Sequence, residues 1–249
     1  MIFQELLELL GRNKRCPNYA AERRIDIFIN YFLEDILTSY YKEKVHFVAP
    51  EFPLKKDEPN NRTVKLDYLC VLDKNKQPLF VELKTDALYF NEQQAKYYAK
   101  RAESWPACIE TLKNIIENSR MRFSFRVKYF YLIKQLLKTD LIDFTDESAK
   151  DLFDRLNTLA KNLRSQKDKG IFSRDFIKLS RHINACWKGK AKLLYLGTND
   201  KKLRDDIENV FNDKANLLDF AQIKELPMRS GMPYSSEFKQ LVGFLKTLK

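Results

Sequence analysis

Cysteine, histidine and glycine are scarce in this chain of 249 residues, with four, two and six copies respectively. The cysteines are widely spaced and form no C-x-x-C pair, so neither a structural zinc site nor a disulfide framework is expected. Free thiols are typical of a cytoplasmic protein. Residues 1–10 lack the basic start and the cleavage site of a signal peptide, and no apolar run is long enough to span a membrane. The sequence therefore predicts a cytoplasmic protein that has no membrane partner.

Positive charge, in contrast, is abundant. The net charge is +11 and the isoelectric point is near 9.3, which favours a polyanionic partner. Nucleic acid is the usual partner of such a chain, and DNA is the favoured one here. Hydrophobic residues make up 44% of the sequence, enough for a sizeable core, and a homo-oligomer is compatible with the composition.

The positive charge is concentrated between residues 160 and 192, which hold ten Lys or Arg and two Asp. Such a cluster could neutralise phosphates along a groove, and a solvated helix face is the alternative. For the aromatic residues of this segment, Phe172, Phe176 and Trp187, a place in the core is favoured over stacking on bases. The predicted nucleic-acid contacts are Lys161, Arg164, Lys167, Arg174, Lys178, Arg181 and Lys188.

Two predicted strands, at residues 64–72 and 78–84, carry charge inside apolar runs. Glu82 and Lys84 project from one face of the second strand because side chains alternate along a strand. If the short connecting turn is centred on residues 74–75, Asp67 on the first strand lies opposite Glu82. Two carboxylates this close repel each other unless a cation lies between them. The alternative is that Glu82 and Lys84 line a solvent-exposed face of an antiparallel sheet.

The ordered set Asp67, Glu82-x-Lys84 resembles the motif of the PD-(D/E)xK nuclease superfamily, with Leu66 in place of the family's leading Pro. The resemblance implies a restriction-endonuclease-like α/β fold, in which an αβββαβ core has a mixed central sheet flanked by helices. It also implies a metal-dependent nuclease that hydrolyses phosphodiester bonds of DNA with an activated water. In this family pattern Asp67, Glu82 and the main-chain carbonyl of Leu83 bind Mg²⁺ or Mn²⁺, and Lys84 orients or deprotonates the water. The alternatives are a catalytically silent nuclease-fold protein that binds nucleic acid or a partner, and an interaction domain whose charges face solvent.

Three further residues join the candidate site. On the helix expected over residues 20–41, Glu22 lies nearer the apolar stripe than Asp26, and it resembles a metal-site Glu of some family members. The alternative for Glu22 is a carboxylate stabilised by the helix N-terminus. Gln94 and Tyr98 share a helix face and resemble the Gln-hydrophobic-x-x-Tyr motif of RecB-type and lambda-exonuclease-type members, which would position DNA or the lysine. In the alternative, Gln94 completes a capping box with Asn91 and Tyr98 only packs.

The other expected elements divide the chain into a nuclease-like core over residues 1–140 and a basic mixed α/β extension over residues 141–249, packed together as one compact unit. In the core we expect helices at 2–10 and 91–118, the latter interrupted near Pro106, and strands at 45–54 and 123–134. In the extension we expect helices at 147–165, 173–187, 201–212 and 235–248, and strands at 191–196 and 217–220.

Overall fold

The computed structural model describes residues 7, 21–55, 63–85, 90–118, 120–163, 165–211, 215–226 and 235–245. No helix in these ranges combines the length and the apolar character needed to cross a membrane. In chain order the elements are α2 (Ala21–Tyr41), β1 (Val45–Lys55), β2 (Thr63–Leu72), β3 (Gln77–Lys84), α3 (Glu92–Ala102), α4 (Trp105–Glu117), α5 (Phe123–Lys138), β4 (Ile142–Phe144), α6 (Glu147–Ala160), α7 (Gln166–Ser180), β5 (Ile183–Ala185), β6 (Lys192–Gly197), α8 (Lys201–Phe211), β7 (Ala215–Asp219), α9 (Phe220–Glu225) and α10 (Ser235–Leu245).

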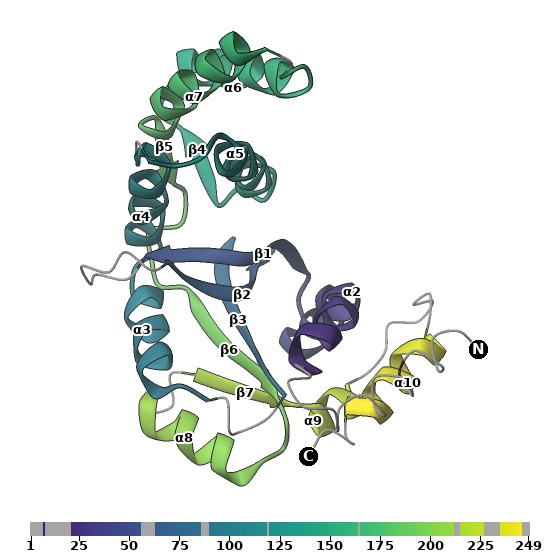
Figure 1. The fold of residues 1–249 in the computed structure, drawn as a ribbon. Coiled ribbons are helices and arrows are strands. Elements are labelled where there is room, and N and C mark those ends of the chain that lie inside the picture. Colours follow the sequence, from purple (N-terminus) through teal and green to yellow (C-terminus); the bar gives the residue numbers. More distant parts are fainter. Residues whose placement is uncertain are drawn as a thin grey trace.

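A mixed sheet forms the centre of the molecule, with strand order β1-β2-β3-β6-β7 (Figure 1). Strands β1, β2 and β3 pair antiparallel, whereas β6 and β7 continue the sheet from β3 as parallel strands. This arrangement confirms the predicted α/β class. Because β6 and β7 belong to residues 192–219, the sheet draws on both of the halves into which the sequence was divided.

Helices cover both faces of the sheet and produce two separate hydrophobic cores. Helices α2, α9 and α10 pack on one face, and α3, α4 and α8 pack on the other (Figure 1). The apolar stripe predicted for α2 is buried as expected, with Ile29 and Leu33 at 0% exposure. Strand β3 lies between the two cores, and its residues 78–81 are apolar and buried. Its C-terminal end carries the charged residues Glu82 and Lys84.

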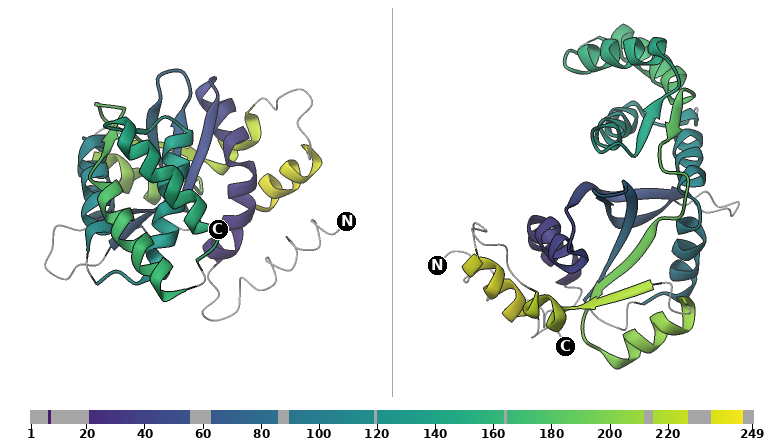
Figure 2. Two further views of the ribbon diagram at one scale, coloured as in Figure 1. Left: turned by 90° about the horizontal axis from the view of Figure 1, so that it is seen from above. Right: turned by 180° about the vertical axis from the view of Figure 1, so that it is seen from behind.

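Helices α5, α6 and α7, with the small β4–β5 sheet, form a lobe that extends beyond the β1 edge of the main sheet (Figures 1 and 2). The strand predicted at 123–134 is wrong, because these residues form helix α5. The aromatic content of the segment favoured a strand, but Arg126, Phe130 and Ile133 recur at helical spacing and lie buried on one face. Strand β6, and not this segment, follows α3 as the next strand of the main sheet.

Side-chain caps explain where several other boundaries differ from expectation. Ser104 caps a new helix, so the segment 91–118 divides into α3 and α4 two residues before Pro106. Ser165 and Asp168 form a capping box that begins α7, so the helix expected at 173–187 starts earlier and ends before β5. The helix predicted at 2–10 lies outside the described residues except for Leu7, which is helical and buried.

Candidate active site

The β2–β3 hairpin has the register that places the two strand carboxylates together. Tyr68 pairs with Val81 and Leu72 pairs with Gln77, around a turn over residues 73–76. The same register puts Asp67 opposite Glu82, as predicted from the turn. The pair therefore lies at the end of the β2–β3 ladder, where the two strands begin to separate.

At this point the carboxylates replace main-chain carbonyls as hydrogen-bond acceptors between the strands. The amide of Leu83 donates to Asp67 Oδ2 at 2.8 Å. The amide of Asp67 donates in turn to Glu82 Oε2 at 3.4 Å. These two bonds fix both carboxylates beside the backbone of the opposite strand, so their position is set by the sheet itself.

Glu82 and Lys84 are buried, with only 2% and 7% of their surfaces exposed. Lys84 Nζ forms an ion pair with Glu82 Oε1 at 2.8 Å. The interpretation in which these charges face solvent is therefore wrong. Asp67 is partly exposed, so it is the residue of the three that contacts solvent most. Ionisable groups at such depth are costly unless each charge is paired or coordinated.

The environment of the pair raises the pKa of both carboxyl groups. Burial is the main cause at Glu82, followed by the charge of Asp67, and together they raise its pKa to about 8 although Lys84 acts in the opposite direction. Burial also raises the pKa of Asp67, opposed by the Leu83 amide and by Lys84. Near neutral pH and without a cation, the pair therefore holds a proton that a bound cation would displace.

Gln94 and Tyr98 lie together on α3, as their spacing predicts, and connect this helix to β2. The Tyr98 hydroxyl donates to the main-chain carbonyl of Lys65 at 2.6 Å, and Gln94 Nε2 donates to the Tyr98 oxygen. Asn91 Oδ1 caps the helix by accepting from the Gln94 amide at 2.9 Å, but the Gln94 side chain is directed to Tyr98 and does not close a capping box. Burial, followed by the charge of Glu82, raises the pKa of Tyr98.

Tyr195 belongs to the site although the sequence did not indicate it. It lies on β6 directly beside Glu82 in the parallel register, and its side chain is buried. Burial and then the charges of Glu82 and Asp67 raise its pKa. The sequence shows Tyr195 only as a residue with a hydroxyl group within an otherwise apolar strand. Its position beside Glu82 becomes apparent only from the pairing of β3 with β6.

The position of Glu22 nearer the apolar stripe of the helix predicts that Glu22, and not Asp26, faces the site, yet it is Asp26 that the structure connects to the site. The fully buried Tyr68 places its hydroxyl within hydrogen-bond distance of the Asp26 carboxylate. The charge of Asp26 also contributes to the raised pKa of Asp67. Glu22 lies in the first turn of α2, but its side chain is outside the described part of the structure, so its role stays a prediction.

Asp67 and Glu82 form a small donor set for a metal. Among the residues that the structure describes, no three His, Cys, Asp or Glu side chains gather closely enough to hold an ion. Mg²⁺ commonly binds through one or two carboxylates and keeps several of its water ligands. Two carboxylates therefore suit Mg²⁺ better than an ion whose ligands all come from the protein. The amide of Leu83 is bound to Asp67, and the ligand role of its carbonyl stays a prediction.

Most of the predicted nucleic-acid contacts that the structure describes lie on helices α6 and α7 of the lobe, and none lies on β2 or β3 with the carboxylates. Four of them are on α7 or at its C-terminal end, and α7 packs against α4, α5 and α6 (Figure 1). Arg174 is within 3.6 Å of Asp175, and Arg181 is within 3.2 Å of Glu117. Lys161 ends α6, Lys188 follows β5, and Arg164 is outside the described residues. Phe172 and Phe176 are fully buried, which confirms their predicted place in the core.

No protein-family model matches the chain, and no curated protein or solved structure matches it. The fold and the site define an α/β protein in which buried Glu82 and Lys84 lie beside the partly exposed Asp67 where two central strands separate.

Proposed function

We propose that this protein is a divalent-metal-dependent nuclease that hydrolyses phosphodiester bonds of DNA. The observation that carries the proposal is the cluster of the partly exposed Asp67 with the buried Glu82 and Lys84, fixed by hydrogen bonds at the end of β2 and β3. With all three groups ionised the cluster has a net charge of −1 in a desolvated site. A divalent cation beside Asp67 would outweigh this negative charge, bring the cluster to +1 and give both carboxylates a positive partner.

The order of elements supports the resemblance to the PD-(D/E)xK superfamily. Helix α2, strands β1, β2 and β3, helix α3 and strand β6 follow the αβββαβ sequence of that core. The helical lobe enters this order between α3 and β6, and β6 still pairs with β3. The resemblance thus extends from the three motif residues to the topology around them.

In this proposal Asp67 and Glu82, with the Leu83 carbonyl, hold Mg²⁺ or Mn²⁺. When bound, the metal supplies polarisation of the scissile phosphate and a water of lowered pKa. Lys84, positioned by its ion pair with Glu82 at 2.8 Å, orients the attacking water and stabilises the negative charge that develops on the phosphate oxygens of the phosphorane. Tyr98 and Gln94 hold β2 in place at Lys65, two residues before Asp67.

The proposal is tested by incubating the full chain with linear, circular and single-stranded DNA, with Mg²⁺, with Mn²⁺ and with chelator. We expect metal-dependent cleavage that Asp67→Asn and Lys84→Ala abolish. Asp73→Asn and Lys74→Ala, in the exposed turn between β2 and β3, are the matched controls and retain activity. Absence of cleavage by the wild type, or equal cleavage by the site variants, refutes the enzyme.

A catalytically silent nucleic-acid-binding protein is the second candidate. It is favoured by one observation: in the described ranges only two carboxylates come together as ligands, and one of them is already paired with Lys84. This candidate predicts DNA binding that Asp67→Asn leaves unchanged, with no cleavage under any metal condition.

A further inference from the structure

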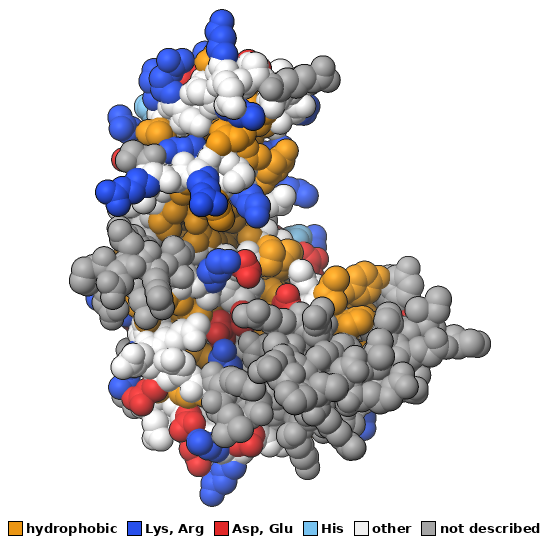
Figure 3. All heavy atoms as spheres, viewed as in Figure 1, with side chains coloured by type: hydrophobic (Ala, Val, Ile, Leu, Met, Phe, Trp, Pro, Cys, Tyr) orange, Lys and Arg blue, Asp and Glu red, His pale blue; other side chains and the backbone are white. Residues whose placement is uncertain are grey.

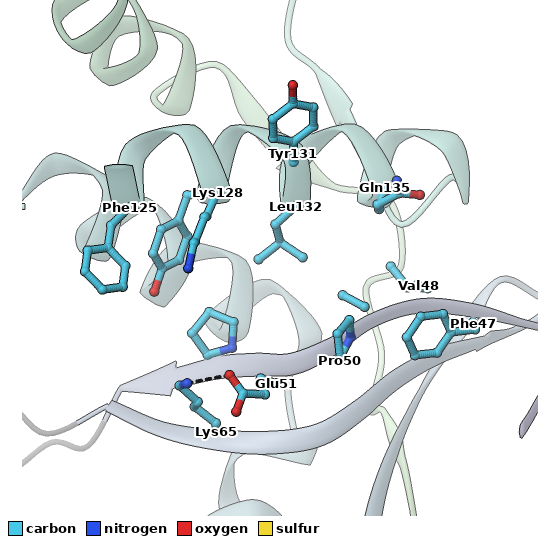
Figure 4. Close-up of a pocket in the computed structure, with 13 residues that line it drawn as sticks. Phe47, Val48, Pro50, Glu51, Lys65, Phe125, Lys128, Tyr131, Leu132 and Gln135 are labelled. Atoms are coloured by element: carbon cyan, nitrogen blue, oxygen red, sulfur yellow. Dashed lines mark hydrogen bonds and ion pairs between the residues drawn. The ribbon is translucent and has the colours of Figure 1, made fainter. Parts of the chain in front are cut away.

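A groove between the main sheet and the helical lobe adjoins the candidate active site. One wall is the outer side of β1, with Lys65 of β2, and the other wall is α5 (Figure 4). The groove encloses about 630 Å³. Figure 3 shows this region as exposed hydrophobic surface bordered by Lys and Arg side chains. Nothing in the proposed cleavage reaction uses it.

The α5 wall presents an aromatic ring and a cation side by side. Phe125 is 49% exposed although it is a large apolar side chain, and Lys128 Nζ lies 5.6 Å from the centre of its ring. Both side chains point from α5 toward β1 (Figure 4). Tyr129 and Leu132 extend the same wall, and Phe47 lies on the opposite one. An exposed ring beside an ammonium is suited to an unpaired base whose phosphate lies next to it.

The charge of the α5 wall also favours a polyanion. Between residues 120 and 138 the chain has six Lys or Arg and no Asp or Glu. Arg126 is buried and donates to the carbonyls of Ile116 and Asn118, so it has a structural role. Of the other five cations, Lys128 lines the groove, whereas Lys134 donates to Asn157 of α6. Lys128 is therefore the α5 cation placed to meet a phosphate in the groove.

The groove reaches β2 at Lys65, two residues before Asp67. The Lys65 side chain lines the groove, and its carbonyl accepts the Tyr98 hydroxyl of the site. Asp67 follows two residues later, roughly 7 Å along the strand. Across the sheet, Glu51 lies between the pairs Pro50–Tyr68 and Phe52–Leu66, which puts it opposite Asp67, and it holds Lys65 at 2.6 Å.

We propose that the groove between β1 and α5 binds single-stranded DNA, with an unpaired base stacked on Phe125 and its phosphate at Lys128, and delivers this strand to Asp67 and Glu82. The inference rests on the proposed function and names the substrate class of the same site. A duplex keeps its bases stacked on one another and therefore offers no free base face to the ring. The protein accordingly binds single-stranded DNA more tightly than duplex DNA of the same length.

The test measures binding of fluorescent oligo-deoxythymidine to the full chain in chelator, by anisotropy, with the corresponding duplex as competitor. Phe125→Ala weakens binding of the single strand roughly fivefold or more, the loss of one base–aromatic stack. Tyr31→Ala is the matched control, because Tyr31 is an exposed aromatic residue on α2 that does not line the groove. Circular dichroism of each variant confirms that the fold is intact.

A second pair of variants tests the phosphate contact. Lys128→Ala reduces the slope of log K against log salt by about 0.7, the value for one phosphate contact to a single strand. Lys138→Ala, which removes the same charge from the last turn of the same helix, leaves that slope unchanged. Ultraviolet cross-linking of an iodouracil-substituted strand, mapped by mass spectrometry, places cross-links on α5 and β1.

Equal affinity of Phe125→Ala and the wild type, preference for duplex, no binding of DNA, or cross-links confined to α7 each overturn the groove, even if the protein cleaves DNA. Binding of the single strand that depends on the groove, without cleavage under any metal condition, supports the proposed binding groove and refutes the proposed nuclease activity. The experiments can therefore refute either proposal without refuting the other.

Discussion

Replacing Glu82 by Gln changes how the stability of the metal-free protein depends on pH. The folded state raises the pKa of Glu82 to about 8, mainly through burial and then through the charge of Asp67. In the unfolded chain the carboxyl returns to its ordinary value of 4.5. Between these values the folded state binds more protons than the unfolded state, so the free energy of unfolding falls as pH rises. The contribution of Glu82 is fully present below its unfolded pKa and is lost as pH rises through the folded one.

The size of this effect follows from the two pKa values. At about 1.4 kcal/mol for each tenfold change in proton affinity, the wild type loses roughly 3 to 4 kcal/mol between about pH 5 and pH 8. Gln is nearly isosteric and has no proton to release, so Glu82→Gln lacks this slope. The difference between the two proteins reports the titration of Glu82 together with the change that its replacement causes at Asp67, the carboxyl group coupled to it.

The assay is urea unfolding at several pH values in chelator, followed by circular dichroism. We expect the wild type to lose stability relative to Glu82→Gln as pH rises, and Mg²⁺ or Mn²⁺ to remove most of that loss by favouring the ionised pair. Glu208→Gln, at an exposed position on α8, is the matched control and follows the wild type at every pH. Parallel stability curves for the wild type and Glu82→Gln would show that Glu82 is not the buried, proton-retaining group described above.

Two other substitutions test the packing around the site, and a third tests helix α7 in the lobe. Gly197→Ala destabilises the fold by about 1–3 kcal/mol in urea unfolding and lowers any cleavage rate, because the new Cβ would lie 2.9 Å from the Lys84 carbonyl oxygen; a neutral substitution contradicts this close approach. Gly170→Ala, inside α7 with open space around it, stabilises the protein by about 0.5–1 kcal/mol in the same assay, and a loss of stability would contradict that. Tyr98→Phe leaves the Lys65 carbonyl without its donor and costs about 1–3 kcal/mol; an unchanged midpoint means that this hydrogen bond contributes nothing.

Local sequence patterns were sufficient for the hairpin and for the helix that precedes it. Four turn residues and two apolar runs determined the register that brings Asp67 to Glu82, because a shift of one residue would reverse every buried side chain. The stripe of α2 was equally clear, since its buried residues recur at helical spacing. For α5 the strand prediction is wrong, because the segment combines the aromatic content typical of a strand with a helical spacing of its buried residues.

The remaining parts of the site depend on contacts between residues far apart in the sequence. Tyr195 reaches Glu82 only because β6 pairs with β3 in parallel, across an intervening segment of more than a hundred residues. Asp26 is connected to the site through Tyr68. The Tyr68 side chain is long enough for its hydroxyl to reach this carboxylate, which lies beside the apolar stripe of α2. A sequence pattern shows which face of an element is apolar, but it does not show which element that face will meet.

The insertion of the lobe between α3 and β6 places the proposed cleavage site and the proposed binding groove on different elements of one fold. The cluster of Asp67, Glu82 and Lys84 depends on β2, β3, α3 and β6, and all four keep their places in or against the main sheet. Helix α5 contacts that sheet at its β1 edge, and the groove lies at this contact. Changes on α5 can therefore alter which strand is bound without moving the carboxylates, whereas changes at β6 act on the carboxylates directly. Phe125→Ala should thus affect affinity, and Gly197→Ala should affect the site itself.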